Sequence, residues 1–195
     1  MSRTSTGLVS AAVLLAALSA CGTDVAGKPT ATGTPTSTSQ QQGSAPQRPA
    51  ELKVDGVDAC KLLTAAQMAE VKVATTVPDQ FESVDDKKQP GCFYENGNNY
   101  SYIVLPATNK GIDYWLEGSG NVAAKLVDVT GYGAAEITFI GAEKVDCAVA
   151  VDVAEGQQLY VSYKPRVKKD ESQQQLCANA KKAASLALET LKTLK

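Results

Sequence analysis

Five cysteines are the residues of this chain whose type and spacing could do chemistry, and no histidine accompanies them. Without an imidazole, the chain lacks the general base that serine and cysteine hydrolases use near neutral pH. It also lacks the histidine ligands of many zinc and copper sites. Carboxylate pairs and serine–lysine pairs are the catalytic arrangements that remain, and we expect neither a metal nor another cofactor.

The first cysteine, Cys21, ends an apolar segment near the N-terminus. Arg3 gives a basic start, and the apolar run 8–18 is shorter than the about 20 residues of a membrane-spanning helix. The sequence LSAC at 18–21 resembles the bacterial lipobox. That resemblance implies cleavage before Cys21, diacylglyceryl transfer to its thiol and acylation of its new amine. We therefore expect 1–20 to be a lipoprotein signal peptide; an ordinary signal followed by an unmodified cysteine is the alternative.

The segment that follows is expected to be a tether. Residues 21–50 hold the lipidated cysteine and a stretch rich in Thr, Ser, Pro and Gln, which is too polar to offset the entropy lost on ordering. As a flexible coil it would average roughly 30 Å end to end. The threonine-rich part at 30–39 could carry O-linked sugars, but a bare spacer is the preferred interpretation.

The remaining residues, 51–195, have the size of one domain. The formal net charge of the chain is −2, and loss of Arg3 with the signal would change it to −3. Nucleic-acid binding would need a clustered basic surface, which this charge does not indicate. The one basic run, KPRVKK at 164–169, is expected to be a solvated turn; contact with anionic lipid or wall polymer is the alternative.

The domain contains four further cysteines: Cys60, Cys92, Cys147 and Cys177. An even number in an exported domain is typical of two disulfides rather than of a nucleophile, and the spacings lack the close pairs that zinc prefers. Three pairings are possible, and the sequence alone does not choose among them. We expect Cys60–Cys92 and Cys147–Cys177, each closing a loop of about 30 residues and contributing roughly 3–4 kcal/mol.

Apolar patterns over 51–195 predict helices at both ends and strands between them. The expected elements are a helix over 58–71, strands over 71–77, 92–94 and 100–105, a short helix over 109–117, strands over 124–129, 135–140, 145–153 and 158–163, and a helix from 170. Asn96-Gly97 and the segment AEGQ at 154–157 indicate hairpins. We therefore expect an α+β fold: a mostly antiparallel sheet with a long C-terminal helix and short helices packed on it.

Capping residues and an apolar stripe are expected to position the helices. Asp58 is expected to cap a first short turn, Thr64 with Gln67 matches a capping box, Asp170 with Gln173 forms a similar pair, and Asn109 is expected to cap the short helix. Cys177 lies beside an apolar stripe on the C-terminal helix, so its disulfide is expected to pin this helix to the sheet. The stripe consists of Leu176, Ala180, Ala183, Ala187, Leu191 and Leu194.

The settings of the domain cysteines resemble domain of unknown function 3558, an actinobacterial family of exported lipoproteins. The family's opening Asp-Pro-Cys, followed by Leu-Leu and a helix cap, is matched at 58–64, with Ala59 in place of proline. Its Gly-Cys-x-aromatic strand is similar to 91–94, with Tyr94 where tryptophan is typical. The remaining matches are the glycine turn at 131–134, Cys147-Ala148-Val149, and Cys177 with Ala180. The resemblance implies an extracytoplasmic α+β domain, akin to photosystem-accessory and Mog1-like sheets, and no known activity.

The sequence combines a lipid anchor, a polar tether and a disulfide-bonded domain, and it lacks a recognisable set of catalytic residues. This combination predicts a non-enzymatic binding or accessory lipoprotein of the cell envelope. It would lie on the outer face of the cell membrane, held in the bilayer by acylated Cys21. As a monomeric domain it would bind an envelope protein or a small ligand, and no nucleic acid. Candidate ligand contacts are Tyr94, Tyr100, Tyr102 and Trp115, followed by Tyr114, Tyr160 and Tyr163. Burial in the core is the preferred interpretation for each of them.

Two other functions stay open. An enzyme acting on cell-wall glycan could use paired carboxylates, such as Asp85 with Asp86 or Glu136 with Asp152. In a chain with 21 acidic residues, such pairs are more simply explained as solvated charge. The other possibility is a regulatory partner of an envelope sensor kinase or secretion complex, which a stoichiometric membrane protein in a pull-down would identify.

Overall fold

A computed structural model describes residues 46–118, 120–141, 145–167 and 170–194. The predicted signal peptide, Cys21 and most of the predicted tether lie outside these described residues. Within them, no helix has the length and apolar character that crossing a membrane requires.

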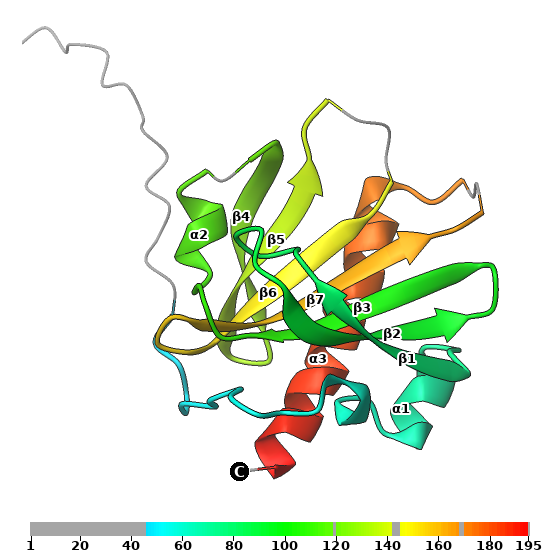
Figure 1. Cartoon of the computed structure of the whole chain (residues 1–195). Coiled ribbons are helices and arrows are strands. Elements are labelled where there is room, and N and C mark those ends of the chain that lie inside the picture. Colours follow the sequence, from blue (N-terminus) through cyan, green and yellow to red (C-terminus); the bar gives the residue numbers. More distant parts are fainter. Residues whose placement is uncertain (1–45, 119, 142–144, 168–169, 195) are drawn as a thin grey trace, which may run out of the picture. The chain divides into compact units, whose positions relative to one another are not determined.

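All seven strands of the described chain belong to one antiparallel sheet (Figure 1). The elements are the 3₁₀ turn η1 (Ala59–Lys61), α1 (Ala65–Glu70), β1 (Thr75–Phe81), β2 (Gln89–Asn96), β3 (Tyr100–Ala107), α2 (Asp113–Leu116), β4 (Val122–Val129), β5 (Tyr132–Phe139), β6 (Cys147–Ala154), β7 (Gln157–Pro165) and α3 (Gln173–Thr193). The strand order is β1-β2-β3-β7-β6-β5-β4. Strand β7 therefore lies between β3 and β6, and the expected α+β fold with a long C-terminal helix is confirmed.

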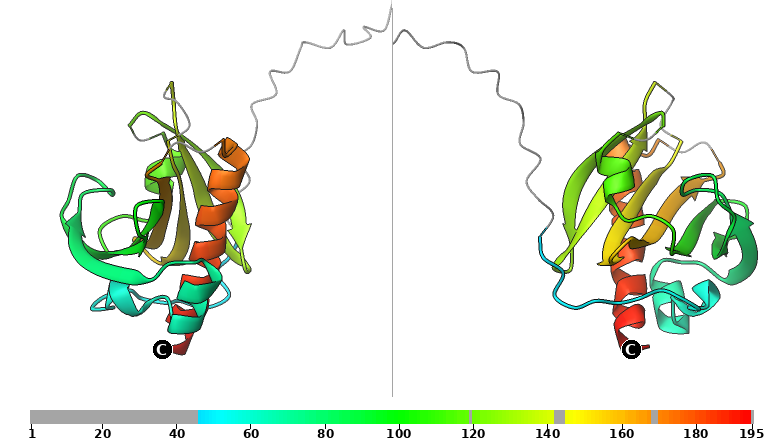
Figure 2. Two further views of the ribbon diagram at one scale, coloured as in Figure 1. Left: turned by 90° about the vertical axis from the view of Figure 1, so that its right-hand side faces the viewer. Right: turned by 60° about the vertical axis from the view of Figure 1, so that its left-hand side comes forward.

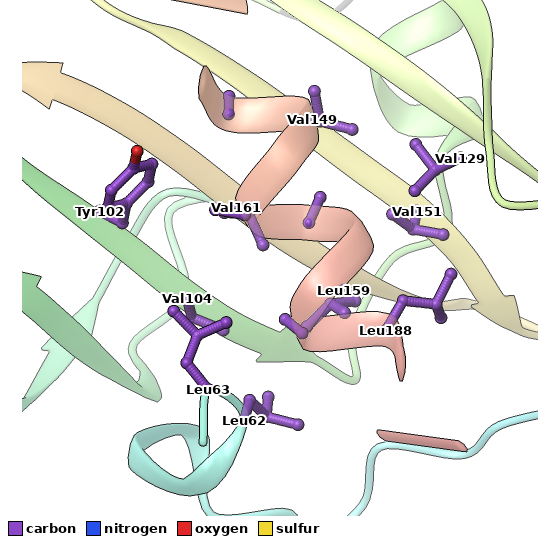
Figure 3. Close-up of a cluster of buried hydrophobic side chains, with 14 of the residues drawn as sticks. Leu62, Leu63, Tyr102, Val104, Val129, Val149, Val151, Leu159, Val161 and Leu188 are labelled. Carbon is purple, nitrogen blue, oxygen red and sulfur yellow. The ribbon is translucent and has the colours of Figure 1, made fainter. Parts of the chain in front are cut away.

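The larger core lies between one face of the sheet and α3. Side chains alternate between faces along a strand, and those of β6 and β7 that turn toward α3 are apolar, among them Val149, Val151, Leu159 and Val161 (Figure 3). The facing side of α3 is built mostly of alanine and leucine, which are fully buried there. Small alanine side chains let the helix approach the sheet closely.

A second apolar cluster covers the opposite face of the sheet. It contains Phe81 at the end of β1, Trp115 of α2 and Tyr160 of β7. The right-hand view of Figure 2 shows α2 in front of the sheet and α3 behind it. Both faces of the central strands are therefore covered, which explains why β6 reads as an almost continuous apolar run.

Both disulfides have the predicted pairing, and each joins a helical element to a strand. Cys60 of η1 is bonded to Cys92 of β2, and Cys147 of β6 to Cys177 of α3. The second bond attaches α3 to the middle of the sheet, as expected. The stripe on α3 is buried from Leu176 to Leu191, but Leu194 follows the helix and is 53% exposed.

The first strand begins later than the sequence predicts. The pattern at 71–77 suggests a strand, but Val71 caps α1 and Lys72 adopts a left-handed conformation with φ of 55°. The amide of Val73 then donates to the carbonyl of Met68, which closes the last turn of the helix. Strand β1 therefore starts only at Thr75, and it ends at Phe81, four residues beyond the expected end of the strand at Val77.

Two of the four predicted helix caps need correction. Asp58 caps η1 by accepting from the amide of Cys60, and the box of Thr64 and Gln67 is present. The long helix α3, however, is capped by Ser172, whose hydroxyl accepts from the amide of Gln175, rather than by Asp170. Asn109 caps nothing: its side chain donates to the carbonyl of Val84 and accepts from Gln89, and α2 starts only at Asp113. Gln173 of the second predicted pair donates instead to the carbonyl of Asp146.

The described chain begins beside the turn between β6 and β7. The amide of Leu52 donates to the carbonyl of Val153 at 2.7 Å, and the Arg48 guanidinium donates to the Asp152 carboxylate at 2.7 Å. Burial raises the pKa of Asp152, and the Arg48 guanidinium opposes that shift. The first described residues thus lie at the end of the sheet where this turn lies (Figure 1).

Candidate functional site

The structure places Tyr94 and Trp115 in the core, which is the preferred interpretation from the sequence. Tyr94 is fully buried; its hydroxyl donates to the carbonyl of Ala59 at 2.8 Å and accepts from the amide of Leu63 at 3.1 Å. Trp115 is 7% exposed and donates from its indole nitrogen to Gln158. Structural bonds account for both side chains, and little of their surface is left for a ligand.

Three other tyrosines come together at the edge of the larger core. Tyr100 and Tyr102 lie on β3, and Tyr163 lies opposite Tyr102 on β7. The ring centroids are 5.3 Å apart for Tyr100 and Tyr163 and 5.1 Å apart for Tyr102 and Tyr163. Figure 3 shows the Tyr102 hydroxyl directed away from the neighbouring valines. We call the hollow that these three rings line the tyrosine pocket.

The tyrosine pocket has a volume of about 490 Å³. It lies between the end of α1, the turn from β2 to β3, and the first half of α3. Besides the tyrosines, it is lined by Glu70, Val71, Lys72, Asn96, Asn99, Glu171, Asn179 and Lys182. Almost every lining side chain carries a hydrogen-bonding group, so the pocket suits a polar ligand.

A hydrogen-bond network fixes a carboxylate inside the tyrosine pocket. The Tyr163 hydroxyl lies 3.2 Å from both carboxylate oxygens of Glu171, and the Asn179 side chain donates to one of them at 3.3 Å. Burial raises the pKa of Tyr163, and the charge of Glu171 raises it further. Burial likewise raises the pKa of Tyr102, with additional effects of Tyr100, Tyr163 and Glu171. Both hydroxyls therefore stay protonated at neutral pH.

The rim of the tyrosine pocket is held by contacts between α1, β3 and α3. Lys182 of α3 forms an ion pair with Glu70 of α1 at 3.0 Å. The Tyr100 hydroxyl donates to the carbonyl of Val71 at 2.9 Å and lies 3.3 Å from that of Lys72. The Tyr100 hydroxyl thus contacts the backbone on both sides of the turn at which Lys72 adopts its left-handed conformation.

The carboxylate pairs considered for glycan chemistry do not form two-acid sites. Glu136 lies on the α3 face of β5, whereas Asp152 lies on the α2 face of β6, opposite Gln158. Two acids on opposite faces of a sheet cannot flank one bond. Asp85 and Asp86 adjoin each other in the loop after β1, where Asp85 pairs with Lys87 and Lys110. Within the described residues, no group of three or more potential metal ligands occurs.

A second hollow, of about 640 Å³, lies between β4, β5 and the start of α3. An ion pair of Lys125 with Glu136 at 2.8 Å crosses its floor, and Cys177 and Lys181 border it. Its other lining residues are the alanines Ala123, Ala124 and Ala178 and the polar residues Thr138, Gln173 and Gln174. It brings together none of the predicted ligand contacts, whereas the tyrosine pocket brings together Tyr100 and Tyr102.

The basic run at 164–169 contributes little to either hollow. Arg166 forms an ion pair with Glu95 of β2, and Lys164 is exposed. Lys168 and Lys169 lie outside the described residues.

Glu171, Asn179 and Lys72 are site residues that the sequence alone does not indicate. Glu171 and Asn179 are eight positions apart, about two helical turns, so they can share one side of a helix that starts near 171. The spacing therefore predicts that Glu171 and Asn179 lie near each other. It does not predict that they contact the tyrosines of the pocket.

Comparison with known proteins gives one result. No curated protein and no solved structure matches the chain. One family model, described as a protein of unknown function, DUF3558, matches residues 16–190 of the 195. The match begins at residue 16, near the end of the apolar run that precedes Cys21, and covers nearly all of the described domain. The chain therefore belongs to the DUF3558 family.

Proposed function

We propose that this protein is a lipid-anchored binding protein on the outer face of the bacterial cell membrane, and that the tyrosine pocket binds its ligand. Cys21, acylated after signal cleavage, anchors the chain in the bilayer. The polar stretch up to residue 50 holds the domain away from the headgroups. The domain itself binds and does not catalyse.

The observation that carries the anchor is the LSAC sequence at 18–21, directly after an apolar run of signal-peptide length. Two or three acyl chains anchor a protein stably, at about 0.8 kcal/mol per buried CH₂. The paired disulfides of the domain add support, because such bonds persist outside the reducing cytosol.

The anchor is tested by mass spectrometry of membrane-extracted native protein without reduction. We expect an N-terminal peptide that starts at Cys21 and carries acyl chains, together with two intact disulfides in the domain. The matched control is Cys21→Ser, which keeps the polar tether and the whole domain and is expected to carry no acyl chain. An unacylated native chain, or a Cys21→Ser chain that is acylated as the native chain is, would overturn the anchor.

The second candidate, a regulatory partner of an envelope protein complex, is favoured by one observation. Large apolar side chains are exposed at the sheet end opposite the Arg48 junction: Phe139 is 52%, Ile140 61%, Val145 42% and Val167 41% exposed. Exposed apolar side chains mark protein interaction sites where they form a contiguous patch.

This candidate is tested by placing a photoreactive amino acid at Ile140 in cells. A matched control carries it at Val77, which is also exposed (44%) but lies on β1. One stoichiometric membrane protein cross-linked from position 140 and not from 77 would support the partner. Equal cross-linking from both positions, or none from 140, would overturn it.

A further inference from the structure

We propose that the tyrosine pocket binds a small ligand through a primary ammonium group, with Glu171 as its charge partner. This inference rests on the proposed function and gives the binding protein a ligand class. It follows from three features of the pocket: an unneutralised carboxylate, oxygen acceptors around it, and the placement of the lysines.

The first feature is the charge of Glu171. Within the described residues, its carboxylate forms no ion pair; its partners are the Tyr163 hydroxyl and the Asn179 amide, both neutral donors. These donors fix where the carboxylate lies but leave its negative charge uncompensated. Burial is the main reason that the pKa values of Tyr102 and Tyr163 are raised, and the charge of Glu171 raises both further. A ligand cation would compensate that charge.

The second feature is the set of hydrogen-bond acceptor residues that line the pocket together with Glu171. An ammonium group donates three hydrogen bonds and therefore needs several acceptors. The Tyr163 hydroxyl donates a hydrogen bond to Glu171, so the lone pairs of the tyrosine oxygen can still accept hydrogen bonds. The Tyr102 hydroxyl and the amide oxygen of Asn99 line the same pocket. Because the tyrosine rings exclude water from one side, a charge pair is stronger here than at an open surface.

The third feature is the arrangement of the lysines. Lys182 is neutralised by Glu70 at 3.0 Å, so it does not compete for Glu171. Lys72 lies at the rim and is exposed. Its charge disfavours a second cationic group on the ligand. The pocket therefore favours a ligand with one ammonium group over a diamine.

The test uses the full-length acylated protein in detergent, labelled with ¹³C on the tyrosine rings, and compares n-butylamine with n-butanol. The two probes have equal length and differ in charge. We expect butylamine to shift the resonances of Tyr102 and Tyr163 with a dissociation constant on the order of millimolar, as befits so small a ligand. Butanol should not shift them. Added salt should weaken the binding of butylamine.

The decisive variant is Glu171→Gln. Its amide keeps the size of the side chain and still accepts from Asn179, so the fold is expected to persist while the charge is lost. Binding of butylamine should fall at least tenfold. Glu155→Gln removes an exposed carboxylate at the far end of the sheet and should leave binding unchanged. Unchanged binding by a folded Glu171→Gln protein would overturn the inference.

Other outcomes separate this inference from the proposed function. If N-acetylglucosamine or butanol shifts the same tyrosine resonances as strongly as butylamine, the pocket binds ligands but not through an ammonium group. The inference then fails while the proposed binding role stands. If none of the probes shifts these resonances, the inference fails as well. Acylation at Cys21 is decided separately by mass spectrometry.

Discussion

The side chain of Gln158 links Trp115, through hydrogen bonds, to the loop that precedes α2. The indole nitrogen of Trp115 donates to the Gln158 side-chain oxygen at 2.7 Å. The amide nitrogen of Gln158 lies 3.0 Å from the carbonyl of Lys110 and 3.3 Å from that of Gly111. Gln158 is fully buried, so α2 is held against the sheet through the interior.

Replacing Gln158 by leucine should destabilise the domain by roughly 2–5 kcal/mol. Leucine has a similar volume, so the loss would come from the Trp115 indole and backbone carbonyls left without partners in the core. Urea unfolding followed by circular dichroism measures the change. The matched control, Gln174→Leu, alters an exposed position and should stay within about 0.5 kcal/mol of wild type. Equal effects of the two substitutions would contradict the role given to Gln158.

Stability should fall at alkaline pH because of Tyr94. Burial raises the pKa of this hydroxyl to about 12, against an opposing effect of its backbone hydrogen bonds. The unfolded chain loses the Tyr94 proton near pH 10 and the folded protein only near pH 12. Below pH 10 the pKa shift of Tyr94 therefore makes its full contribution to the free energy of unfolding. Between pH 10 and pH 12 this contribution should decline by about 1.4 kcal/mol per pH unit.

The variant Tyr94→Phe isolates this contribution. It should be less stable at pH 7 by about 1–3 kcal/mol, because the amide of Leu63 and the carbonyl of Ala59 lose their partner. Between pH 10 and 12 the free energy of unfolding of the variant should fall less steeply than that of the wild type, because unfolding no longer releases the Tyr94 proton. Other buried tyrosines still contribute to the fall in both proteins. Urea unfolding at a series of pH values measures both effects. Parallel declines in wild type and variant would show that the Tyr94 pKa is not raised.

Replacing Lys72 by glycine should stabilise the domain by about 1 kcal/mol. Lys72 follows α1 with φ of 55°, a conformation that costs a side chain about that much and glycine almost nothing. The control, Lys72→Ala, removes the same charge but keeps a Cβ, so it should give no such gain. Thermal unfolding of the three proteins distinguishes them. If Lys72→Ala were stabilised as much as Lys72→Gly, the charge of Lys72 would be unfavourable rather than its left-handed backbone conformation.

Removing the bond between Cys147 and Cys177 by changing both to alanine should destabilise the domain by roughly 3–4 kcal/mol. The bond closes a loop with a sequence separation of 30, and that loop costs entropy to close in the unfolded chain. The Cys60–Cys92 bond has a separation of 32, so its double alanine variant should lose a similar amount. Denaturant unfolding of both variants tests this. A loss below about 1 kcal/mol for either pair would contradict the loop-entropy account.

Local features of this fold can be predicted from sequence, because they depend on residues close along the chain. The capping box at Thr64 and the hairpin at Asn96-Gly97 are of this kind. The segment at 71–73 misleads for the same reason: alternating valines suggest a strand, while the helix end is decided by the Val73–Met68 bond. Where two local interpretations compete, contacts made by α1 decide between them.

The tyrosine pocket could be predicted only in part. Tyr100 and Tyr102 stand out as aromatic residues on one strand, but their meeting with Tyr163 depends on β7 pairing with β3. No local pattern indicates that β7 enters the sheet between β3 and β6. Glu171 and Asn179 reach the pocket only once α3 is placed on that face, so their role appears with the tertiary structure.

The Cys147–Cys177 bond also bears on how the protein would withstand proteases outside the cell. The segment between β7 and α3 contains Arg166, Lys168 and Lys169, after which trypsin cleaves. A nick there would cut the chain but release no fragment, since Cys177 of α3 stays bonded to Cys147 of β6. The severed helix would keep Glu171 and Asn179 with it. A nicked molecule would therefore still present an assembled pocket until a reductant reached the bond.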